Sequence, residues 1–323
     1  MNPSLFLQAL DVEITRQRYG EQPTELYEPI RYLMALGGKR LRPVLTLLGV
    51  SLYTDDWQKA VRPAVAVEVF HNFTLMHDDI MDRAPLRRGQ PTVHEKWNGN
   101  VAILSGDVML VQAYELLLDV EPDLLRPVLA RFNRTAAEVC EGQQWDMNFE
   151  TRAAVSEAEY LEMIRLKTAV LLGFALELGA LLGRAPAADA FALRQIGQNI
   201  GLGFQLKDDY LDVYGQPDKF GKLVGGDILA NKKTFLLIDA LEKARGATRA
   251  ELERWLGAKE FNPVEKVEAV TAIYNDLGVA QTAEALMNRY FANAFALLAE
   301  LPAEPRRKTI LRHFAEQLVG RER

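Results

Sequence analysis

Apolar residues recur at helical spacing along almost the whole chain, and this pattern limits the fold more than any other feature of the sequence. Examples are AVEVFHNFTLMHDDIMD, VAILSGDVMLVQAYELLLDV and LRQIGQNIGLGFQLKDDYLDVYG. The sequence contains no convincing run of the strict alternation that is typical of strands. Breakers, among them Pro85, Pro122, Pro127 and Gly215, separate the apolar stretches. The sequence therefore predicts an all-α protein of about ten or more helices.

Several predicted helices are apolar around most of their circumference. They cover residues 60–82, 100–120, 124–148, 156–182 and 189–214. Helices of this kind are interior members of a bundle or lie in a subunit interface. No stretch rich in Pro, Gly or Ser separates two differently composed halves, so we expect one domain over residues 1–323.

Charge and cysteine content exclude some classes of function. The net charge of -6 and the pI near 5.5 argue against a nucleic-acid-binding protein, which normally needs a positive surface. The single cysteine, Cys140, cannot form an intrachain disulfide and suits a reducing compartment, which favours a cytoplasmic location. No window reaches the roughly 18 uninterrupted apolar residues of a membrane span. We therefore expect no transmembrane segment.

Two clusters of aspartates interrupt the apolar helices. The first is Asp78, Asp79 and Asp82 in HDDIMD, and the second has the same DDxxD form in KDDYLD, from Asp208 to Asp212. The spacing puts the first and last Asp of each triad on one helix face, where like charges repel. A hard divalent cation removes this conflict, and Mg²⁺ held by carboxylates keeps positions open for substrate phosphate oxygens. One such triad could be a solvated helix end, but two copies favour a metal site.

Basic motifs alternate with the acidic triads. GGKRLRP brings together Lys39, Arg40 and Arg42, and RRGQPTVH contains an Arg pair in a Pro/Gly loop. RLKTA, GK, GGD and NKKT follow further along the chain. Each basic pair alone is more often a solvated surface feature, so the alternation with acidic triads is what predicts diphosphate binding.

The order and spacing of these motifs resemble the trans-isoprenyl diphosphate synthases, the farnesyl and geranylgeranyl diphosphate synthase group. The likeness runs from GGKRLRP through HDDIMD, RRGQPTVH, EGQQWD, RLKTA and GFQLKDDYLDVYG to GKLVGGDILANKKT. It implies the isoprenoid synthase fold, a large helical bundle around a central apolar cavity, and a homodimer. It also implies that the two triads face each other at the cavity mouth with three Mg²⁺ ions.

The resemblance also assigns roles to individual residues. The acidic residues expected to hold Mg²⁺ and the allylic diphosphate are Asp78, Asp82, Asp208 and Asp212. The cationic residues expected to clamp that diphosphate are Arg87, Lys167, Lys222 and Lys232. Isopentenyl diphosphate, which carries no metal in this family, is expected on Lys39, Arg42, His71 and Arg88. Thr168 and Gln205 are expected beside the substrate, as are Gln143 and Asp146 of EGQQWD, although a Gln on a buried helix is often only a hydrogen-bonded core residue.

The expected reaction joins isopentenyl diphosphate head-to-tail to dimethylallyl, geranyl or farnesyl diphosphate. A growing chain passes along the helix that precedes the first triad, so Phe70, Phe73 and Thr74 are expected to form its floor. In the family pattern an aromatic at the position of Phe73 blocks long products, and Thr74 is small where many farnesyl synthases carry a second aromatic. The resemblance therefore favours the C20 product, geranylgeranyl diphosphate, over C15, and longer chains are less favoured. The two Phe could equally be ordinary core aromatics.

Two other classes compete with this interpretation. A terpene cyclase or squalene-type synthase is not expected to carry GGKRLRP together with two complete DDxxD motifs. A noncatalytic partner subunit of a heteromeric prenyl synthase commonly shows damaged triads, whereas both triads are intact here. The sequence therefore favours an active prenyltransferase.

Overall fold

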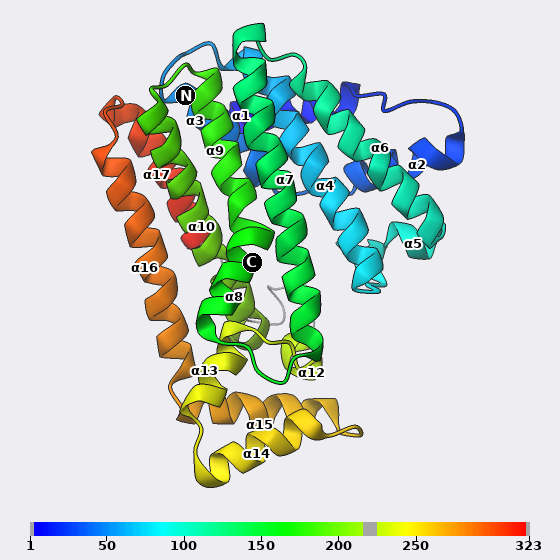
Figure 1. The fold of residues 1–323 in the computed structure, drawn as a ribbon, viewed down its shortest axis with the longest axis vertical. Coiled ribbons are helices and arrows are strands. Elements are labelled where there is room, and N and C mark those ends of the chain that lie inside the picture. The colour runs from blue at the N-terminus through cyan, green and yellow to red at the C-terminus, as the bar shows by residue number, and fades with distance from the viewer. Residues whose placement is uncertain (1–2, 216–224, 321–323) are drawn as a thin grey trace. The chain divides into compact units, whose positions relative to one another are not determined.

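The computed structural model describes residues 3–215 and 225–320, and its regular structure is almost entirely helical (Figure 1). The helices are α1 (Pro3–Arg16), α2 (Thr24–Ala35), α3 (Leu41–Ser51), η1 (Trp57–Ala60), α4 (Val61–Met81), α5 (Val93–Lys96), α6 (Gly99–Leu117), α7 (Pro122–Thr151), α8 (Glu157–Ile164), η2 (Arg165–Ala169), α9 (Val170–Leu182), α10 (Ala187–Tyr214), α12 (Gly226–Leu229), α13 (Phe235–Lys243), α14 (Gly246–Gly257), α15 (Pro263–Asp276), α16 (Val279–Glu300) and α17 (Pro305–Val319). Two strands of two residues each, β1 (Leu86–Arg87) and β2 (Gln90–Pro91), complete the described structure. The predicted all-α class is confirmed.

The chain divides into two compact units that are interleaved in the sequence. The first contains Met1–Thr135, Leu171–Arg194 and Leu301–Leu311, and the second contains Ala136–Val170, Gln195–Glu300 and Arg312–Arg323. Two long helices, α7 and α10, contribute residues to both units. A single domain over residues 1–323 stays a prediction.

The first unit is built around α4. This helix packs against α1, α2, α3 and α6, and α4 and α6 run side by side in Figure 1. Every residue from Pro63 to Phe70 is buried, so α4 has no solvent face over that stretch. This explains why its sequence is apolar around the whole circumference rather than along one stripe. The helix ends at the first acidic triad, which it holds on a rigid support.

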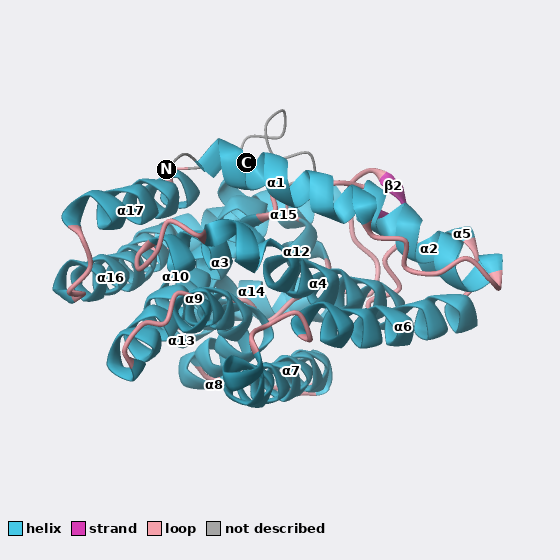
Figure 2. Cartoon of the chain, turned by 90° about the horizontal axis from the view of Figure 1, so that it is seen from above, coloured by secondary structure: helices cyan, strands magenta, loops and turns pink. Residues whose placement is uncertain are grey.

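A short hairpin follows α4. Leu86 pairs with Pro91 and Arg87 with Gln90, in antiparallel register. Arg88 and Gly89 form the turn with φ values of 53° and 74°, the left-handed pair that a tight two-residue hairpin requires. The Tyr32 hydroxyl of α2 donates to the carbonyl of Pro91 at 2.8 Å, which ties the hairpin to α2. Figure 2 shows this strand beside α2.

The second unit contains the last part of the chain and the second acidic triad. Within it, α15 contacts α12, α13, α14 and α16, and α13 also contacts α8. Between α8 and α9 the helix widens to a π turn, η2. Turns of this kind interrupt the regular ladder of hydrogen bonds and are frequent at functional sites.

Two expectations about the helices need correction. Pro127 does not separate two helices, because it lies inside α7. A proline so close to the start removes one backbone hydrogen bond, while the fully buried Val128 and Phe132 anchor the helix just beyond it. The predicted helix over 156–182 is three consecutive segments, α8, η2 and α9.

No helix among the described residues is both long enough and apolar enough to cross a membrane.

We expect Ser156→Ala to lower the free energy of unfolding by about 1 kcal/mol. Ser156 Oγ accepts from the Glu159 N–H at 3.3 Å, and the Glu159 carboxylate accepts in return from the Ser156 N–H at 3.0 Å, which closes a capping box at the start of α8. Urea unfolding measures the change. Ser156→Asp keeps a capping oxygen and should unfold near the wild-type midpoint, whereas equal midpoints for Ala and Asp would contradict the capping role.

Candidate active site

The first acidic triad lies in the last turn of α4. Asp78 and Asp82 are four residues apart, and the Asp82 N–H donates to the Asp78 carbonyl at 2.8 Å as the helix ends. The C-terminal end of a helix carries partial negative charge, so carboxylates there are electrostatically unfavourable. Cations close by are therefore required to offset this charge.

Asp79 points into the protein, where it pairs with the guanidinium of Arg87. Its carboxylate is buried and accepts two hydrogen bonds from Arg87, from Nε at 2.8 Å and from Nη2 at 2.7 Å. This fork-to-fork geometry fixes the guanidinium plane. Arg87 was expected to clamp a diphosphate, and three of its five N–H groups remain outside this pair. The structure thus anchors Arg87 through the middle Asp of the triad.

All four residues expected to bind isopentenyl diphosphate belong to the first unit, as does the first acidic triad. Lys39 is exposed, Arg42 and His71 are half-buried, and Arg88 lies at the hairpin turn. Arg88 Nη1 donates to the carbonyl of Gly37, so the hairpin contacts the GGKRLRP loop. The structure therefore joins the two basic motifs that the sequence separates by about fifty residues.

His71 lies among arginines. Its partial burial, followed by the charges of Arg42 and Arg88, holds the pKa of its imidazole well below the usual range. The ring is therefore neutral at pH 7 and offers a neighbouring group a hydrogen bond rather than a charge. His77 Nε2 contacts the Ile103 carbonyl at 3.1 Å, and the centroid of its ring lies 4.8 Å from that of Phe73.

Arg40 departs from the expectation that all three cations of GGKRLRP gather around a diphosphate. Its side chain is buried, and Nη1 donates to Glu68 Oε1 of α4 at 2.7 Å. A guanidinium enclosed in this way is occupied by its carboxylate partner. Lys39 and Arg42 remain the two cations of this loop with solvent-accessible side chains.

The second acidic triad belongs to the second unit, in the last two turns of α10. Asp208 is exposed, Asp212 is half-buried and Asp209 is buried. Asp212 Oδ2 accepts from the Asp227 N–H of α12 at 2.9 Å, which fixes the GGD motif against the triad. Asp212 lies in the last turn of α10, where the helix end carries partial negative charge, and Asp208 and Asp209 lie about one turn earlier.

Asp209 has a buried hydrogen-bonding shell of its own. Gln205 Nε2 donates to Asp209 Oδ1 at 3.1 Å, and the buried Tyr160 hydroxyl of α8 donates to Oδ2. Burial, with the charge of Asp227, raises the pKa of Asp209 to about 7. In both triads the middle Asp is thus a structural anchor, and the outer two Asp are the more solvent-accessible members.

Cationic groups accompany this triad within the second unit. Lys167 Nζ contacts Asp146 Oδ2 at 2.5 Å, which brings RLKTA and EGQQWD together. Burial opposes ionisation of Asp146, but the charges of Lys167 and Lys232 outweigh it and lower its pKa. Lys232 is exposed. Lys222, the remaining predicted clamp, lies outside the described residues.

RLKTA coincides with the π turn, and a glycine permits its close contact with α7. Thr168 Oγ1 donates to Gln205 Oε1 at 3.0 Å, so the π turn is joined to α10. A Cβ on Gly142 would lie 2.2 Å from the Lys167 backbone nitrogen and 2.6 Å from its Cα. Only glycine lets the backbones approach this closely at that point.

The predicted floor residues lie on α4 in the first unit. Phe70 is fully buried and Phe73 nearly so, with their ring centroids 5.5 Å apart. Phe70 also packs edge-on against Phe132 of α7 at 5.1 Å. Thr74 Oγ1 donates back to the His71 carbonyl at 2.8 Å and adds little bulk. The two rings therefore lie between one and about two turns before Asp78 on α4.

Comparison with known proteins agrees with the motifs and their placement. The polyprenyl synthetase family model matches residues 23–275. The chain belongs to the polyprenyl synthetase family. A geranylgeranyl diphosphate synthase from Methanosarcina mazei is 40% identical over 303 residues, 93% of this chain and 91% of that protein. A geranylfarnesyl diphosphate synthase from Natronomonas pharaonis is 38% identical, covering 71% of this chain and 73% of that protein.

A solved structure gives the same answer for the fold. The geranylgeranyl pyrophosphate synthetase from Pyrococcus horikoshii superposes with a TM-score of 0.91 at 32% identity, covering 99% of this chain and 97% of that one. The predicted isoprenoid synthase fold, the predicted family and the predicted prenyltransferase activity are thereby confirmed.

Sequence reasoning did not anticipate the roles of several polar residues of this synthase. Glu68 had a visible signal, since it is a lone acid in the apolar segment AVEVFHNF. Asp227 stands in the GGD motif that the sequence marks, but its contact with Asp212 was not predicted. Tyr160 had no signal, because tyrosines are common in amphipathic helices. Their roles become visible only through the contacts with Asp209 and Asp212.

We expect Gly142→Ala to lower turnover by about ten-fold to a hundred-fold, because the added methyl displaces the backbone that carries Lys167. Steady-state assays with labelled isopentenyl diphosphate measure the loss. Gly99→Ala is the matched control, since a Cβ there meets nothing within 4 Å. A Gly142→Ala enzyme as active as the control would show that this close contact is dispensable.

Proposed function

We propose that this polyprenyl synthetase condenses isopentenyl diphosphate head-to-tail with dimethylallyl, geranyl and farnesyl diphosphates, with geranylgeranyl diphosphate as the main product. The observation that carries the proposal is the pair of DDxxD motifs at the C-terminal ends of α4 and α10, each accompanied by basic side chains within its own unit. The geranylgeranyl diphosphate synthases among the relatives support the choice of product.

The donor set suits magnesium bound together with a diphosphate. Aspartate oxygens are hard ligands, and Mg²⁺ in substrate complexes usually takes one or two carboxylates and completes its shell with phosphate oxygens and water. Among the residues that the structure describes, no group of three or more His, Cys, Asp or Glu is arranged as a metal site by itself. This fits a metal that arrives with its substrate. Asp78, Asp82, Asp208 and Asp212 would hold it, with three ions expected.

Each group of side chains has its own task in the proposed reaction. Arg87, Lys167 and Lys232 bind the allylic diphosphate, and Lys222 is proposed to join them. Isopentenyl diphosphate is placed on the basic residues Lys39, Arg42, His71 and Arg88. Thr168 and Gln205 form a hydrogen-bonded pair that orients the π turn beside the substrate. No protein nucleophile is required, because positioning and charge stabilisation carry the reaction.

The chemical step breaks the allylic carbon to oxygen bond and forms a new carbon to carbon bond. Magnesium, when bound, supplies positive charge that stabilises the departing diphosphate. Arg87 and the lysines add to that stabilisation through charge-assisted hydrogen bonds. The double bond of isopentenyl diphosphate then attacks the allylic carbon, and a proton leaves to the released diphosphate. Apolar side chains around the substrate keep water from the reacting carbon.

Chain length is proposed to be set along α4. Phe73 precedes Asp78 by five residues, about 7.5 Å along the helix, and Phe70 stands one turn further. The contacts of Phe70 with Phe73 and Phe132 make this floor stiff. A C20 product is favoured over C15 because Thr74 leaves room where a second aromatic would close the path. A longer product is the alternative that the Natronomonas relative represents.

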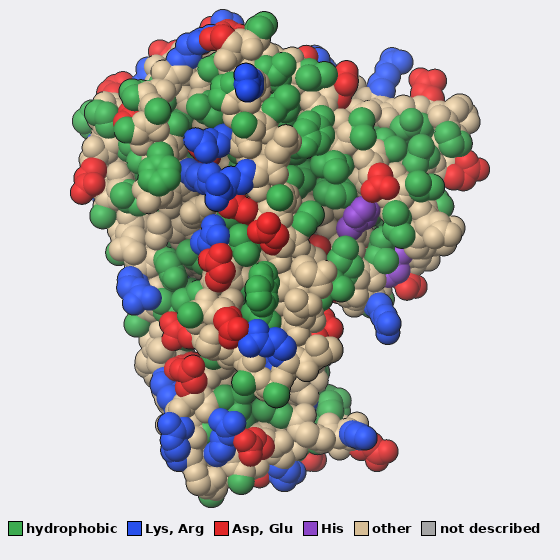
Figure 3. Space-filling view, viewed as in Figure 1, with side chains coloured by type: hydrophobic (Ala, Val, Ile, Leu, Met, Phe, Trp, Pro, Cys, Tyr) green, Lys and Arg blue, Asp and Glu red, His purple; other side chains and the backbone are tan. Residues whose placement is uncertain are grey.

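A homodimer is proposed from one face of α6. Leu104, Val111 and Leu118 recur every seven residues on this helix and its C-cap, and each is more than half exposed. Figure 3 shows hydrophobic side chains gathered over α6 and the first part of α7. A seven-residue stripe suits packing against the same stripe of a second copy.

A cytoplasmic location, expected from the single cysteine, stays a prediction.

The noncatalytic partner subunit remains the alternative from another class. It predicts no product from the purified chain alone with any of the three allylic diphosphates. Incubation with Mg²⁺, labelled isopentenyl diphosphate and each allylic diphosphate in turn, followed by sizing of the products, separates the two proposals. Product formation by the chain alone would exclude the partner role, and its complete absence would defeat the catalytic proposal.

We expect Asp78→Ala and Asp208→Ala each to reduce turnover by about 10²-fold to 10³-fold, as the loss of charge stabilisation in a transition state does. Initial rates with saturating substrates and Mg²⁺ measure this. Asp276→Ala is the control, because Asp276 is an exposed aspartate in the last turn of α15, outside either acidic triad. Wild-type rates in either triad variant would contradict the assignment of these carboxylates.

We expect Phe73→Ala to lengthen the main product by at least one C5 unit, because removing the ring opens the path along α4. Leu75→Ala, two residues further on and on the far side of the helix, should leave the length unchanged. Chromatography of the dephosphorylated products gives both answers. An unchanged product length in Phe73→Ala would defeat the floor hypothesis without affecting the metal assignment.

A further inference from the structure

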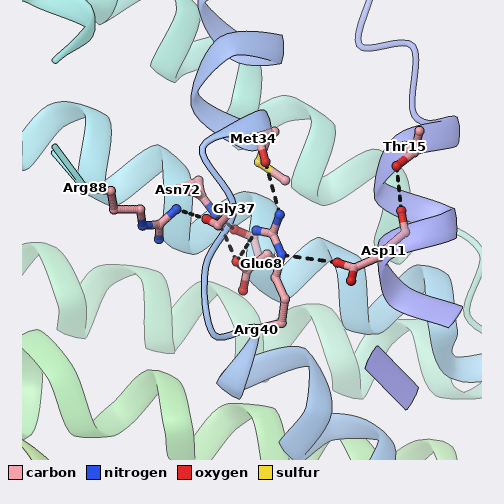
Figure 4. Close-up of polar contacts among 8 residues, drawn as sticks. All are labelled: Asp11, Thr15, Met34, Gly37, Arg40, Glu68, Asn72 and Arg88. Atoms are coloured by element: carbon pink, nitrogen blue, oxygen red, sulfur yellow. Dashed lines mark hydrogen bonds and ion pairs between the residues drawn. The ribbon is translucent and has the colours of Figure 1, made fainter. Parts of the chain in front are cut away.

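A buried ion pair lies behind the GGKRLRP loop, on the side away from its solvent-facing cations. Arg40 Nη1 donates to Glu68 Oε1 at 2.7 Å, and the two side chains are 6% and 3% exposed (Figure 4). Removing two charges from water is costly, and their attraction offsets that cost only when other hydrogen bonds complete the shell. Stability alone is therefore a weak explanation for this buried pair.

The loop conformation depends on the Arg40 side chain. Arg40 has left-handed backbone angles, φ 48° and ψ 34°, which are unfavourable for a residue with a β-carbon. Its Nη2 donates to the Met34 carbonyl in α2 at 3.1 Å, and its Nε lies 3.7 Å from Asp11 of α1. One guanidinium therefore joins the loop to α1, α2 and α4 and holds the strained turn in place.

Glu68 is fixed from its own side. Asn72 Nδ2, one turn later on α4, donates to the Glu68 carbonyl at 2.8 Å and to Oε1 at 3.3 Å. Figure 4 shows Asn72 and Arg40 meeting the Glu68 carboxylate from different directions. These hydrogen bonds fix the Glu68 carboxylate relative to α4. Because Arg40 is bonded to that carboxylate, the loop that carries Arg40 is fixed relative to α4 as well.

Each side chain proposed to bind isopentenyl diphosphate either lies within three residues of Arg40 or Glu68 in the sequence or contacts the GGKRLRP loop. Lys39 and Arg42 flank Arg40 in sequence, and His71 lies three residues after Glu68 on α4. Arg88 reaches the loop through the Gly37 carbonyl, as Figure 4 shows. A shift of the loop would move Lys39 and Arg42 relative to His71 and Arg88.

We propose that Arg40 and Glu68 are positioning residues that set the geometry of the isopentenyl diphosphate subsite without touching the substrate. The inference rests on the proposed function, because that function places isopentenyl diphosphate on these four side chains. It adds a role for a buried pair that the reaction itself does not use. Affinity for isopentenyl diphosphate should then depend on the pair, and affinity for the allylic substrate should not.

The test compares Glu68→Gln with Glu177→Gln. Glu177 is a second buried acid of the same unit, paired with Arg131 at 3.1 Å, so its variant reports general loss of stability. Titration calorimetry with isopentenyl diphosphate alone measures binding without turnover, and steady-state assays give KM for each substrate. Glu68→Gln should raise the Kd for isopentenyl diphosphate about ten-fold, leave the allylic KM within about two-fold, and differ in this from Glu177→Gln.

Glu68→Asp covers the case in which Glu68→Gln fails to fold. It keeps the charge but withdraws the carboxylate from Arg40 by one methylene, so a smaller rise confined to isopentenyl diphosphate is expected. Equal weakening of both substrates, the same loss in Glu177→Gln, or unchanged binding in the Glu68 variants would each overturn the proposal. A wild-type chain that binds isopentenyl diphosphate but forms no product would instead defeat the proposed function, and the binding measurement would still decide this inference.

Discussion

The constraint on which the site depends is the placement of carboxylates at the negative ends of two helices. The last turn of α4 and the last two turns of α10 each contain three aspartates, toward helix ends whose aligned peptide dipoles disfavour negative charge. The middle aspartate of each triad has partners within the protein. Arg87 neutralises Asp79, and Tyr160 and Gln205 donate hydrogen bonds to Asp209. The outer aspartates keep the charge that a metal-bound diphosphate would complement.

The fold was largely predictable because buried helices leave a strong record in the sequence. A helix such as α4, buried on all sides, must be apolar on all sides, and its limits follow from the change to polar residues. Local signals were less reliable. Pro127 is a breaker by type, yet the buried Phe132 beyond it holds α7 together. The hairpin was not predicted because two residues per strand are too few to show alternation.

The site was predictable in its residue types and much less so in its pairings. Clustered aspartates and glycine-flanked cations identify the chemistry, but the sequence does not tell which cation serves the substrate and which serves the protein. Arg40 and Lys39 are neighbours of similar charge, and only packing against α4 shows that Arg40 belongs to Glu68. The π turn around Lys167 was equally hidden, because its residues continue an ordinary helical pattern.

Glu68, Phe73 and Asp78 lie on one unbroken helix, α4. In the proposed function, in which Phe73 stops the growing chain and Asp78 holds the reacting end, the number of residues between the two is therefore fixed. Moving the stop by one residue shifts it only about 1.5 Å lengthwise but swings it about 100° around the axis. The position of the stop along α4 therefore cannot change gradually. Product length among related enzymes should change in steps, either by substitution of the side chain at the same position or by insertion of a whole helical turn.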